Sequence, residues 1–494
     1  MLDLAFVRHN PDAVARACEQ KGVDLDVASL LRLDEIVRLY QAWTNAVESV
    51  SNDISRRIKN FFVKQHQLKP AYAGSTVDIK LRLSVLSNLT DELYHPSERG
   101  ARLTKLSLQD RHRALKVLLR EKTRIDTYLL QGNFESNELV EELKESVRDL
   151  APLASFLRRE SADERKTLED SLYKLPNIPY AGAPVGPDES FNTVIRTEGT
   201  PRDFAFTPLD HVALIEKNDW ADLSRIVQVA GSRTYCLKGR LALLEGALMQ
   251  WALTKIAAAG FTPITVPAIT RTQAFFNQGQ FPGHEEEIYH LERDDLWLAG
   301  TAEVALTSLH SGEILDLSNG PIRYAGLSPC FRREAGSAGR DVRGLLRVHQ
   351  FMKVEQYVIC EADEAVSAEW HAKLLALAEE LLTDLDIPYQ VIETSTGDMG
   401  LGKYRMNDIE SWVPSLGKYR ETHSCSTLHD WQARRANLRY RDSDGKVRFA
   451  HTLNNTALAS PRILVPLLEN HQTEDGRVRL PEAIRPLMGG GEFL

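Results

Sequence analysis

The fold is decided by residues 330–351, which read Cys330-Phe331-Arg332-Arg333-Glu334-Ala335-Gly336-Ser337-Ala338-Gly339-Arg340-Asp341-Val342-Arg343-Gly344-Leu345-Leu346-Arg347-Val348-His349-Gln350-Phe351. Two apolar, strand-like flanks enclose a glycine-containing loop with four arginines from Arg333 to Arg347, after Arg332 on the incoming strand. Guanidinium groups bind carboxylate and phosphate through two parallel hydrogen bonds, which lysine cannot copy. The alternative is a surface hairpin with charges at its tip, but five arginines and an aromatic residue at the return are unusual for one. The stretch therefore predicts an anion-binding hairpin.

The chain around this hairpin mixes helical and strand-like patterns. Helical runs cover Leu241 to Ala259 and Glu364 to Asp384. Short β-branched or aromatic runs cover Phe261 to Val266, Ile322 to Leu327 and Tyr389 to Ile392. Strands separated by turns rather than by regular helices favour an antiparallel sheet flanked by helices, not a doubly wound sheet. We therefore expect an α+β fold.

The sequence contains no complete Walker motif for binding phosphates. Gly400-Leu401-Gly402-Lys403 is a fragment of one, but it lacks the full spacing and the strand–loop–helix context. Any nucleotide must then be held by side chains.

The first third of the chain has the pattern of two long helices. Apolar residues recur in steps of four and three at Ile36, Tyr40, Trp43, Val47, Val50 and Ile54. A second apolar series contains Leu139, Leu143, Val147, Leu150, Leu157, Leu168 and Leu172. Each series is typical of a helix packed along a partner, and two such helices fold most simply as an antiparallel hairpin. Pro152 should kink or break the second helix.

Prolines and glycines mark the end of this helical part. Leu175-Pro176-Asn177-Ile178-Pro179 is followed by further breakers at Gly182, Pro184, Gly186 and Pro187. Such a density ends a helix and begins an extended connector. We therefore expect a helical arm at 1–175, a connector at 176–200 and the α+β domain at 201–494. Residues of about 61–138 form an enlarged distal insert of the arm, with breakers at Pro70, Gly74 and Pro96 and a helical patch from Ser107 to Leu130.

Charge is distributed unevenly along the chain, whose net charge is −9. Arg56 to Arg124 contains sixteen basic and six acidic residues, a net charge of +10, which leaves −19 for the rest. A basic segment on an acidic protein indicates contact of one module with a polyanion. The alternative, a solvated and lysine-rich helical surface, stays open on charge alone.

Composition excludes several classes of protein. The longest apolar stretches are broken by charge well before 18 residues, so we expect no membrane partner. Met1 to Asn10 lacks the pattern of a signal peptide, and Asp3 argues against a transit peptide. The five cysteines are scattered without C-x-x-C spacing, so we expect neither disulfides nor zinc. The expected compartment is the cytoplasm.

The motifs in their order along the chain resemble those of one enzyme family. Phe331 to Phe351 resembles motif 2 of the class II aminoacyl-tRNA synthetases, in the form used by the seryl enzymes. Gly260 to Pro267 is similar to motif 1, which lies at a dimer interface in the family, and Arg462 stands in the place of the motif 3 arginine. The other matching segments are Met1–Leu4, Gly22–Asp24, Thr301–Val304, Lys353–Glu355, Thr396–Asp398, Arg420–Ser426, Gln432–Arg435 and His451–Asn454.

The resemblance implies a seryl-tRNA synthetase that activates L-serine with ATP and transfers it to the 3′ end of tRNA(Ser), with tRNA(Sec) as a further candidate. It implies a class II catalytic domain, a homodimer, and an arm that binds the long variable arm of the tRNA. Activation is attack by the serine carboxylate on the α-phosphorus of ATP, so two anions must be brought together. The attacking carboxylate is already ionised, and we therefore assign no general base.

The resemblance also implies a role for each candidate site residue. Arg332 and Arg462 are the catalytic candidates, with Arg332 contacting both the serine carboxylate and the α-phosphate. The serine site consists of Thr301 and Glu303 for the ammonium, Arg332 for the carboxylate, and Glu355 and Thr456 for the hydroxyl. The ATP site consists of Arg332, Glu334, Val348, Phe351, Glu421, Ser424 and Arg462. Glu421 and Ser424 would bind Mg²⁺, which prefers oxygen ligands.

The sequence departs from the family in three places. The segment before Arg462 lacks the glycines common in motif 3, and Thr456 stands where serine is frequent. His423 replaces a serine of the metal-binding sequence and is best interpreted as a neutral histidine. The arm is longer than the usual hairpin.

The sequence has three alternatives to a housekeeping enzyme. A catalytically silent paralogue would lack Arg332, Glu355, Glu421 or Arg462, and all four are present. A paralogue that loads a carrier protein or peptide need not keep a tRNA-binding arm, so the basic arm speaks against it. A resistance-type duplicate stays open.

Overall fold

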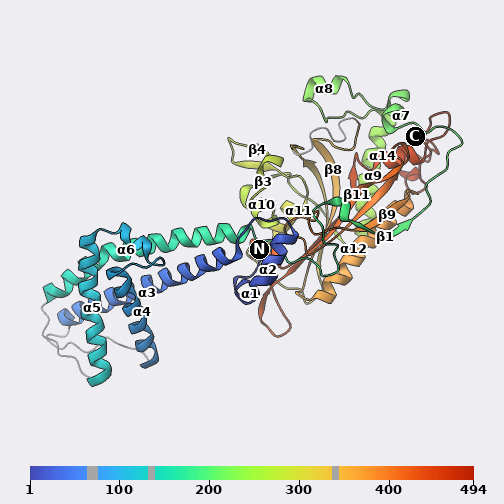
Figure 1. The fold of residues 1–494 in the computed structure, drawn as a ribbon. Coiled ribbons are helices and arrows are strands. Elements are labelled where there is room, and N and C mark those ends of the chain that lie inside the picture. The colour runs from blue at the N-terminus through green and yellow to red at the C-terminus, as the bar shows by residue number, and fades with distance from the viewer. Residues whose placement is uncertain (64–75, 132–139, 336–343) are drawn as a thin grey trace. The chain divides into compact units, whose positions relative to one another are not determined.

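The computed structural model describes residues 1–63, 76–131, 140–335 and 344–494 (Figure 1). Contacts divide the chain into a helical unit, Asp26–Leu172, and a sheet unit formed by Met1–Leu25 and Tyr173–Leu494. The prediction counted residues 1–25 with the arm, whereas these contacts group them with the sheet unit. One reason is that the Asp3 carboxylate, which caps the first helix, forms an ion pair of 2.7 Å with Arg434.

The helical unit contains four α-helices within the described ranges: α3 (Val27–Val63), α4 (Thr76–Tyr94), α5 (Leu108–Gln131) and α6 (Val140–Tyr173). A 3₁₀ turn at Ala101–Lys105 lies between α4 and α5. Residues 64–75 and 132–139 of the predicted insert, with Pro70 and Gly74, lie outside the described residues. The predicted helical patch from Ser107 to Leu130 is confirmed as α5.

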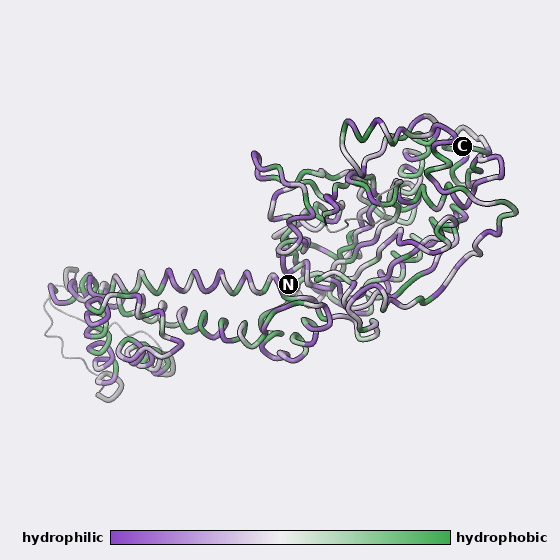
Figure 2. The backbone as a smooth tube through the Cα atoms, turned by 45° about the horizontal axis from the view of Figure 1, so that its top comes forward, coloured by the Kyte–Doolittle hydropathy of each residue, from purple (hydrophilic) through white to green (hydrophobic). Residues whose placement is uncertain are grey.

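Helices α3 and α6 form the predicted antiparallel hairpin (Figure 1). Arg165 donates a hydrogen bond of 2.8 Å to Gln41, and Arg158 donates one of 2.7 Å to Glu48. Higher numbers on α3 thus pair with lower numbers on α6, as antiparallel helices require. Hydropathy alternates along both helices (Figure 2), because each buries only one side.

The apolar seam predicted for the first helix is part of the core of this unit. Tyr40, Trp43, Val47, Val50 and Ile54 are all fully buried. They pack in one cluster with residues of the other three helices, among them Leu86, Leu89, Leu118, Ile125, Leu150 and Leu157. The helices α4 and α5 are therefore built into the core of the hairpin.

Pro152 does not break α6, contrary to one of the two outcomes expected for it. The helix continues from Val140 to Tyr173 with Pro152 inside it. The neighbouring Leu150 and Leu153 are fully buried in the core. Packing on both sides of the proline holds the helix together despite the lost hydrogen bond.

The sheet unit is built on eight strands in the order β1-β9-β10-β11-β14-β8-β7-β2. Their bounds are β1 (Thr193–Glu198), β2 (Thr262–Thr265), β7 (Ile322–Phe331), β8 (Gln350–Cys360), β9 (Tyr389–Glu393), β10 (Arg405–Val413), β11 (Lys418–His429) and β14 (His451–Ser460). All neighbours are antiparallel except β2 and β7. The expected antiparallel sheet flanked by helices is confirmed, and β1 lies in the range predicted as connector.

Side chains of β8 alternate between the two faces of this sheet. Val354, Val358 and Cys360 pack in a core that includes α9 (Gly239–Ala258) and α12 (Glu364–Asp384). Tyr357 and Ile359 face a second cluster on the other side. Because residues two apart share a face of a strand, Phe351, Lys353 and Glu355 also face that second side.

Smaller elements complete the sheet unit. Two three-stranded sheets are formed by β3 (Ile269–Arg271), β4 (Tyr289–Leu291) and β5 (Leu296–Leu298), and by β6 (Ile314–Leu315), β12 (Arg439–Arg441) and β13 (Val447–Phe449). The remaining helices are α1 (Leu4–His9), α2 (Pro11–Gln20), α7 (His211–Lys217), α8 (Arg225–Ala230), α10 (Thr272–Gln278), α11 (Glu303–Leu309), α13 (Trp431–Ala436) and α14 (Leu464–Asn470). None of the helices in the described ranges is long and apolar enough to cross a membrane.

Candidate active site

One pocket on the sheet unit is lined by every side chain that the sequence analysis assigned to a substrate. These residues are Thr301, Glu303, Arg332, Glu334, Val348, Phe351, Glu355, Glu421, Ser424, Thr456 and Arg462. They come from β8, β11, β14, α11 and the loops beside these elements, with Arg332 directly after β7. The fold thus brings together residues as far apart as 301 and 462 along the chain.

The arginine-rich stretch forms a hairpin between β7 and β8. Arg332 follows β7 directly, and its backbone N–H donates a hydrogen bond of 3.0 Å to the carbonyl of His349. Glu334 has a φ of +54°, in the left-handed region, and its carboxylate lies 3.4 Å from the Arg347 guanidinium. Residues 336–343, with Arg340 and Arg343, lie outside the part of the chain that the structure describes.

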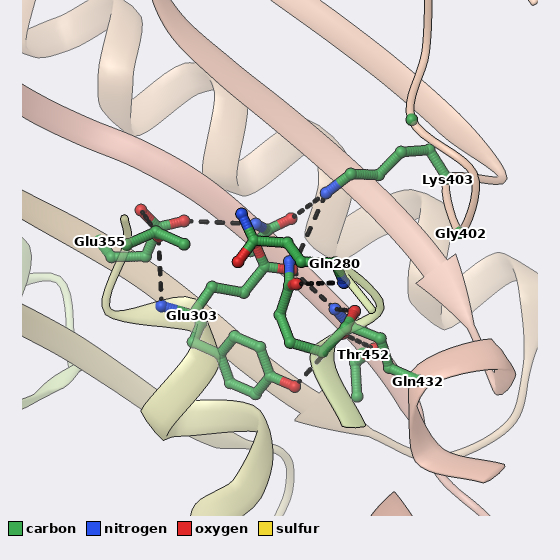
Figure 3. Close-up of polar contacts among 12 residues, drawn as sticks. Gln280, Glu303, Glu355, Gly402, Lys403, Gln432 and Thr452 are labelled. Atoms are coloured by element: carbon green, nitrogen blue, oxygen red, sulfur yellow. Dashed lines mark hydrogen bonds and ion pairs between the residues drawn. The ribbon is translucent and has the colours of Figure 1, made fainter. Parts of the chain in front are cut away.

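Glu355 lies at the buried end of the pocket and is only 1% exposed. Lys353, on the same face of β8, forms an ion pair with Glu355 and donates a hydrogen bond of 2.7 Å to Thr301. Asn454 donates to the other carboxylate oxygen at 3.3 Å (Figure 3). Thr456 pairs with Glu355 in register across β14 and β8. A buried carboxylate is therefore placed beside a threonine hydroxyl in a polar recess.

Glu303 begins α11 and supplies a second buried carboxylate. Gln432 donates a hydrogen bond of 2.7 Å to its Oε1 atom, and Thr452 fixes Gln432 through a hydrogen bond of 2.8 Å. Lys403 reaches in from a loop, with its Nζ atom 3.8 Å from Glu303 and 3.4 Å from Asn454 (Figure 3). Glu303 thus combines a firm amide contact with a looser cationic one.

The other side of the pocket carries two guanidinium groups. The guanidinium of Arg332 lies over the ring of Phe351, at 5.2 Å from its centroid. Arg462 lies 3.5 Å from the Glu421 carboxylate and donates to the carbonyl of Leu346 at 3.3 Å. Both guanidinium groups thus line the pocket, where an anion can reach them.

An incomplete set of oxygen ligands lies beside Arg462. Glu421 and Ser424 line the pocket, and Ser424 pairs in register with Asp408 of β10. Asp408 is buried, and its Oδ1 atom has no partner among the residues described. Burial, and then the charge of Glu421, raise the pKa of Asp408 well above its usual value. Glu421 and Ser424 are the lining residues here whose oxygen atoms could hold a cation.

His423 is buried away from the pocket lining. Its Nδ1 atom lies 2.8 Å from the Thr422 hydroxyl, and burial lowers the pKa of His423 to about 4. At neutral pH the imidazole is uncharged. This agrees with the interpretation of His423 as a plain neutral histidine.

Comparison with known proteins identifies the family. The profile of the Seryl-tRNA synthetase N-terminal domain matches residues 1–94, and that of the tRNA synthetase class II core domain (G, H, P, S and T) matches residues 288–471. The chain is 46% identical to the serine–tRNA ligase of Deinococcus radiodurans, over 100% of this chain and 99% of that protein. The chain belongs to the seryl-tRNA synthetase family. It is also 45% identical to the serine–tRNA ligase of Corynebacterium efficiens, over 99% and 98% of the two chains.

Solved structures of seryl-tRNA synthetases agree with this membership. The enzyme from Pyrococcus horikoshii, complexed with ATP, matches with a TM-score of 0.75 at 33% identity, over 99% of this chain and 98% of that one. The cytoplasmic enzyme from Naegleria fowleri, in complex with AMP, matches with a TM-score of 0.74 at 28% identity, over 100% and 98%. The family resemblance drawn from the motifs is thus confirmed along the whole chain.

Sequence reasoning about this seryl-tRNA synthetase family member missed several pocket residues. Lys353 could have been found, because it lies two residues before Glu355 on a strand and must share its face. Lys403 was considered only as part of a failed phosphate-loop motif, and nothing in the sequence places it opposite Glu303. Gln280 and Asn454 also line the pocket; Gln280 was not singled out, and Asn454 was named in a matching segment without a role.

Proposed function

We propose that this pocket activates L-serine with ATP and transfers the seryl group to the 3′ end of tRNA(Ser). As a member of its family the chain is an ATP-dependent serine–tRNA ligase that forms AMP and diphosphate. One observation carries the assignment to this pocket: it is lined by two buried carboxylates, of Glu303 and Glu355, and by two guanidinium groups. The guanidinium groups belong to Arg332 and Arg462. The first pair suits an ammonium and a hydroxyl, and the second suits a carboxylate and phosphates.

Serine recognition is assigned to the buried side. Thr301 and Glu303 bind the ammonium, while Glu355 and Thr456 bind the hydroxyl. The Lys353 ammonium and the Asn454 amide already hold the Glu355 carboxylate, so it is fixed before the substrate arrives. A fixed, buried acceptor rejects alanine, because alanine would leave it without the hydrogen bond that serine supplies.

Activation is assigned to Arg332. Its guanidinium neutralises the serine carboxylate and the α-phosphate together and so aligns the attack on phosphorus. The guanidinium of Arg332 packs over the Phe351 ring, and a cation–π contact of this kind uses none of the N–H donors that would bind the two anions. Adenine binding is assigned to Glu334 for the amino group, Val348 for the lining, and Phe351 and Arg462 for the two ring faces.

Mg²⁺ is assigned to Glu421 and Ser424. Among the described residues no group of three or more His, Cys, Asp or Glu side chains is arranged to hold a metal ion by itself. A site of one carboxylate and one hydroxyl fits an ion that also takes phosphate oxygens and water. The unpartnered Oδ1 atom of buried Asp408, beside Ser424, supports a cation there. When bound, the ion would offset the phosphate charge.

The partners follow from the two units. The helical unit is assigned to tRNA(Ser), with tRNA(Sec) as a further candidate. A homodimer is proposed through the segment Gly260–Pro267, which contains β2 at the edge of the eight-stranded sheet. Cytoplasmic location is proposed from the reduced, scattered cysteines.

ATP–pyrophosphate exchange with each of the amino acids tests the proposed function. The full-length enzyme should exchange pyrophosphate into ATP with L-serine and should charge tRNA(Ser). Alanine, threonine and glycine should give rates close to background. Preferred exchange with any other amino acid, or exchange with serine but no transfer to tRNA, would favour the specialised paralogues.

A further inference from the structure

The loop of residues 400–403, which carries Lys403 into the pocket, is held by two side chains from distant parts of the sheet unit. Lys21 donates from its Nζ atom to the carbonyls of Gly400 at 3.3 Å and Leu401 at 3.2 Å, and also to the carbonyl of Lys403. Asn177 donates from its side chain to the carbonyl of Gly402 at 3.1 Å. Every carbonyl of the loop therefore accepts a hydrogen bond from one of these two residues.

The position of the Lys21 ammonium beside the loop carbonyls is unfavourable for its charge. It follows α2 and is half-buried, with its ammonium group turned to the loop carbonyls. Burial, and then the charge of Lys403, lower the pKa of Lys21 to about 7. A desolvated lysine beside another cation opposes folding in its charged form, and the three carbonyls are the groups that compensate for it.

Lys403 stops short of the carboxylate that it faces. Its Nζ atom is 3.8 Å from Glu303 Oε1, within the range of an ion pair but too far for a hydrogen bond. Glu303 is the group assigned to the serine ammonium. A lysine ammonium and a substrate ammonium have the same charge and the same donors, so they compete for this carboxylate.

We propose that Lys21 is a positioning residue for serine recognition, which holds loop 400–403 so that Lys403 cannot close on Glu303. The carboxylate is then left open for the ammonium of the substrate. Without the three bonds from Lys21 the loop relaxes, Lys403 moves within hydrogen-bond distance of Glu303 and takes the place of the substrate ammonium. The inference rests on the proposed function, since it assumes that Glu303 binds the serine ammonium.

Pyrophosphate exchange by full-length Lys21→Met tests this role. The KM for serine should rise about tenfold, while kcat and the KM for ATP change by less than about twofold. In a Lys403→Met background the same change at Lys21 should leave the KM for serine within about twofold, because no lysine is then present to close on Glu303. Lys21→Arg, which keeps donors for the carbonyls, should restore most of the affinity for serine.

Arg202→Met is the matched control. Arg202 also donates to two backbone carbonyls, of Asn470 at 3.4 Å and Gln472 at 3.0 Å, and none of these three residues lines the pocket. Its loss should lower the melting temperature without raising the KM for serine. If Lys21→Met folds poorly, Lys21→Gln gives the same comparison, with a smaller rise that must again vanish in the Lys403→Met background.

Two results would overturn the inference. One is an unchanged KM for serine in Lys21→Met, and the other is an equal rise with and without Lys403, which would mean a general loosening of the site. Failure of the proposed function is recognised separately, because the unmodified enzyme would then show no serine-dependent exchange.

Discussion

Buried carboxylates occur in both units, but in different surroundings. In the helical unit Glu121, 1% exposed, lies between Arg57 and Arg124, and Asp53 lies 2.7 Å from Arg82. In the sheet unit Glu303 and Glu355 are equally buried, but their carboxylates face a pocket. The first set of charges is paired away from any described pocket, whereas the second lines a pocket that a ligand can enter, even though Glu355 is also paired with Lys353. Burial of a charge alone therefore does not identify a binding site.

The same comparison shows that the net charge of Arg56–Arg124 overstates the charge available to bind a nucleic acid. Arg57, Arg82, Arg102 and Arg124 all belong to the segment of net charge +10, and each is paired with a buried acid of its own unit. Asp26–Leu172 as a whole contains twenty-four basic and twenty-three acidic residues. Part of the positive charge of the segment is thus used in ion pairs within the helical unit, and the exposed basic side chains are the ones that can meet a nucleic acid.

The largest expected effect is on catalysis and concerns a charged residue that lines the pocket. Arg332→Ala should lower kcat/KM for serine-dependent pyrophosphate exchange by about a thousandfold or more, because the lost guanidinium faces charge that develops in the transition state. Arg333→Ala is the control, since the neighbouring Arg333 does not line the pocket, and it should cost far less. Equal losses in the two variants would contradict the role given to Arg332.

A change to a buried acid of the helical unit should instead lower stability and leave activity unchanged. Glu121→Gln should lower the free energy of unfolding of the helical unit by about 3 kcal/mol, because two largely buried guanidinium groups lose their carboxylate. Serine-dependent pyrophosphate exchange should stay normal. Glu141→Gln, at an exposed pair of 2.8 Å with Lys144, is the control and should change stability little. Hydrogen exchange measured by mass spectrometry separates the two units.

The two units also differ in how well their structure could be predicted from the sequence. Periodicity predicted both long helices and their pairing, because the seam from Tyr40 to Ile54 obeys a purely local rule. It failed to place Lys403 opposite Glu303, since that contact depends on the folded path of a loop. It expected Pro152 to kink or break its helix, and the break does not occur, because tertiary packing overrides a local preference. The candidate site residues were assigned through the order of the motifs. The ion pairs that neutralise part of the basic segment could not be predicted, because their partners are far apart in the sequence.

A third expected effect is the acid sensitivity of the sheet unit. Burial lowers the pKa of His371 to about 4, of His423 to about 4 and of His451 to about 3, from an ordinary value of 6.5. Between pH 6.5 and 4 these three histidines therefore bind protons in the unfolded state but remain unprotonated in the folded state. Stability is fully present above pH 6.5 and is lost as the pH falls, by up to about 1.4 kcal/mol per pH unit for each histidine.

Calorimetric unfolding between pH 7 and 4.5 measures this loss. His371→Gln should flatten the pH dependence of the sheet unit, because one of the three groups is removed. His290→Gln, at an ion pair with an exposed Asp295, is the control and should leave the slope unchanged. A pH dependence that is the same in His371→Gln and the unmodified enzyme would assign the acid sensitivity to other groups.

The smallest expected effect concerns the charge that is left over in the helical unit. Arg113 and Lys116 lie on α5 with exposed side chains, one turn apart, on the unit assigned to tRNA(Ser). Each phosphate contact releases counterions and adds roughly 0.7–0.9 to the slope of log affinity against log salt. Arg113→Ala with Lys116→Ala should therefore flatten that slope by about 1.5 and weaken tRNA binding modestly at low salt.

The matched variant for this pair is Arg102→Ala. Its guanidinium is bound to Glu160 at 3.1 Å and to Glu164 at 2.6 Å, so its charge is already neutralised within the hairpin. Arg102→Ala should lower stability yet leave the salt slope as it is. Serine-dependent pyrophosphate exchange should be normal in both variants, and a changed anticodon should alter neither slope, because contacts to RNA phosphates do not depend on the anticodon sequence. If Arg102→Ala flattens the slope as much as the exposed pair does, the basic segment acts through its total charge. The distinction between paired and exposed charges would then fail for tRNA.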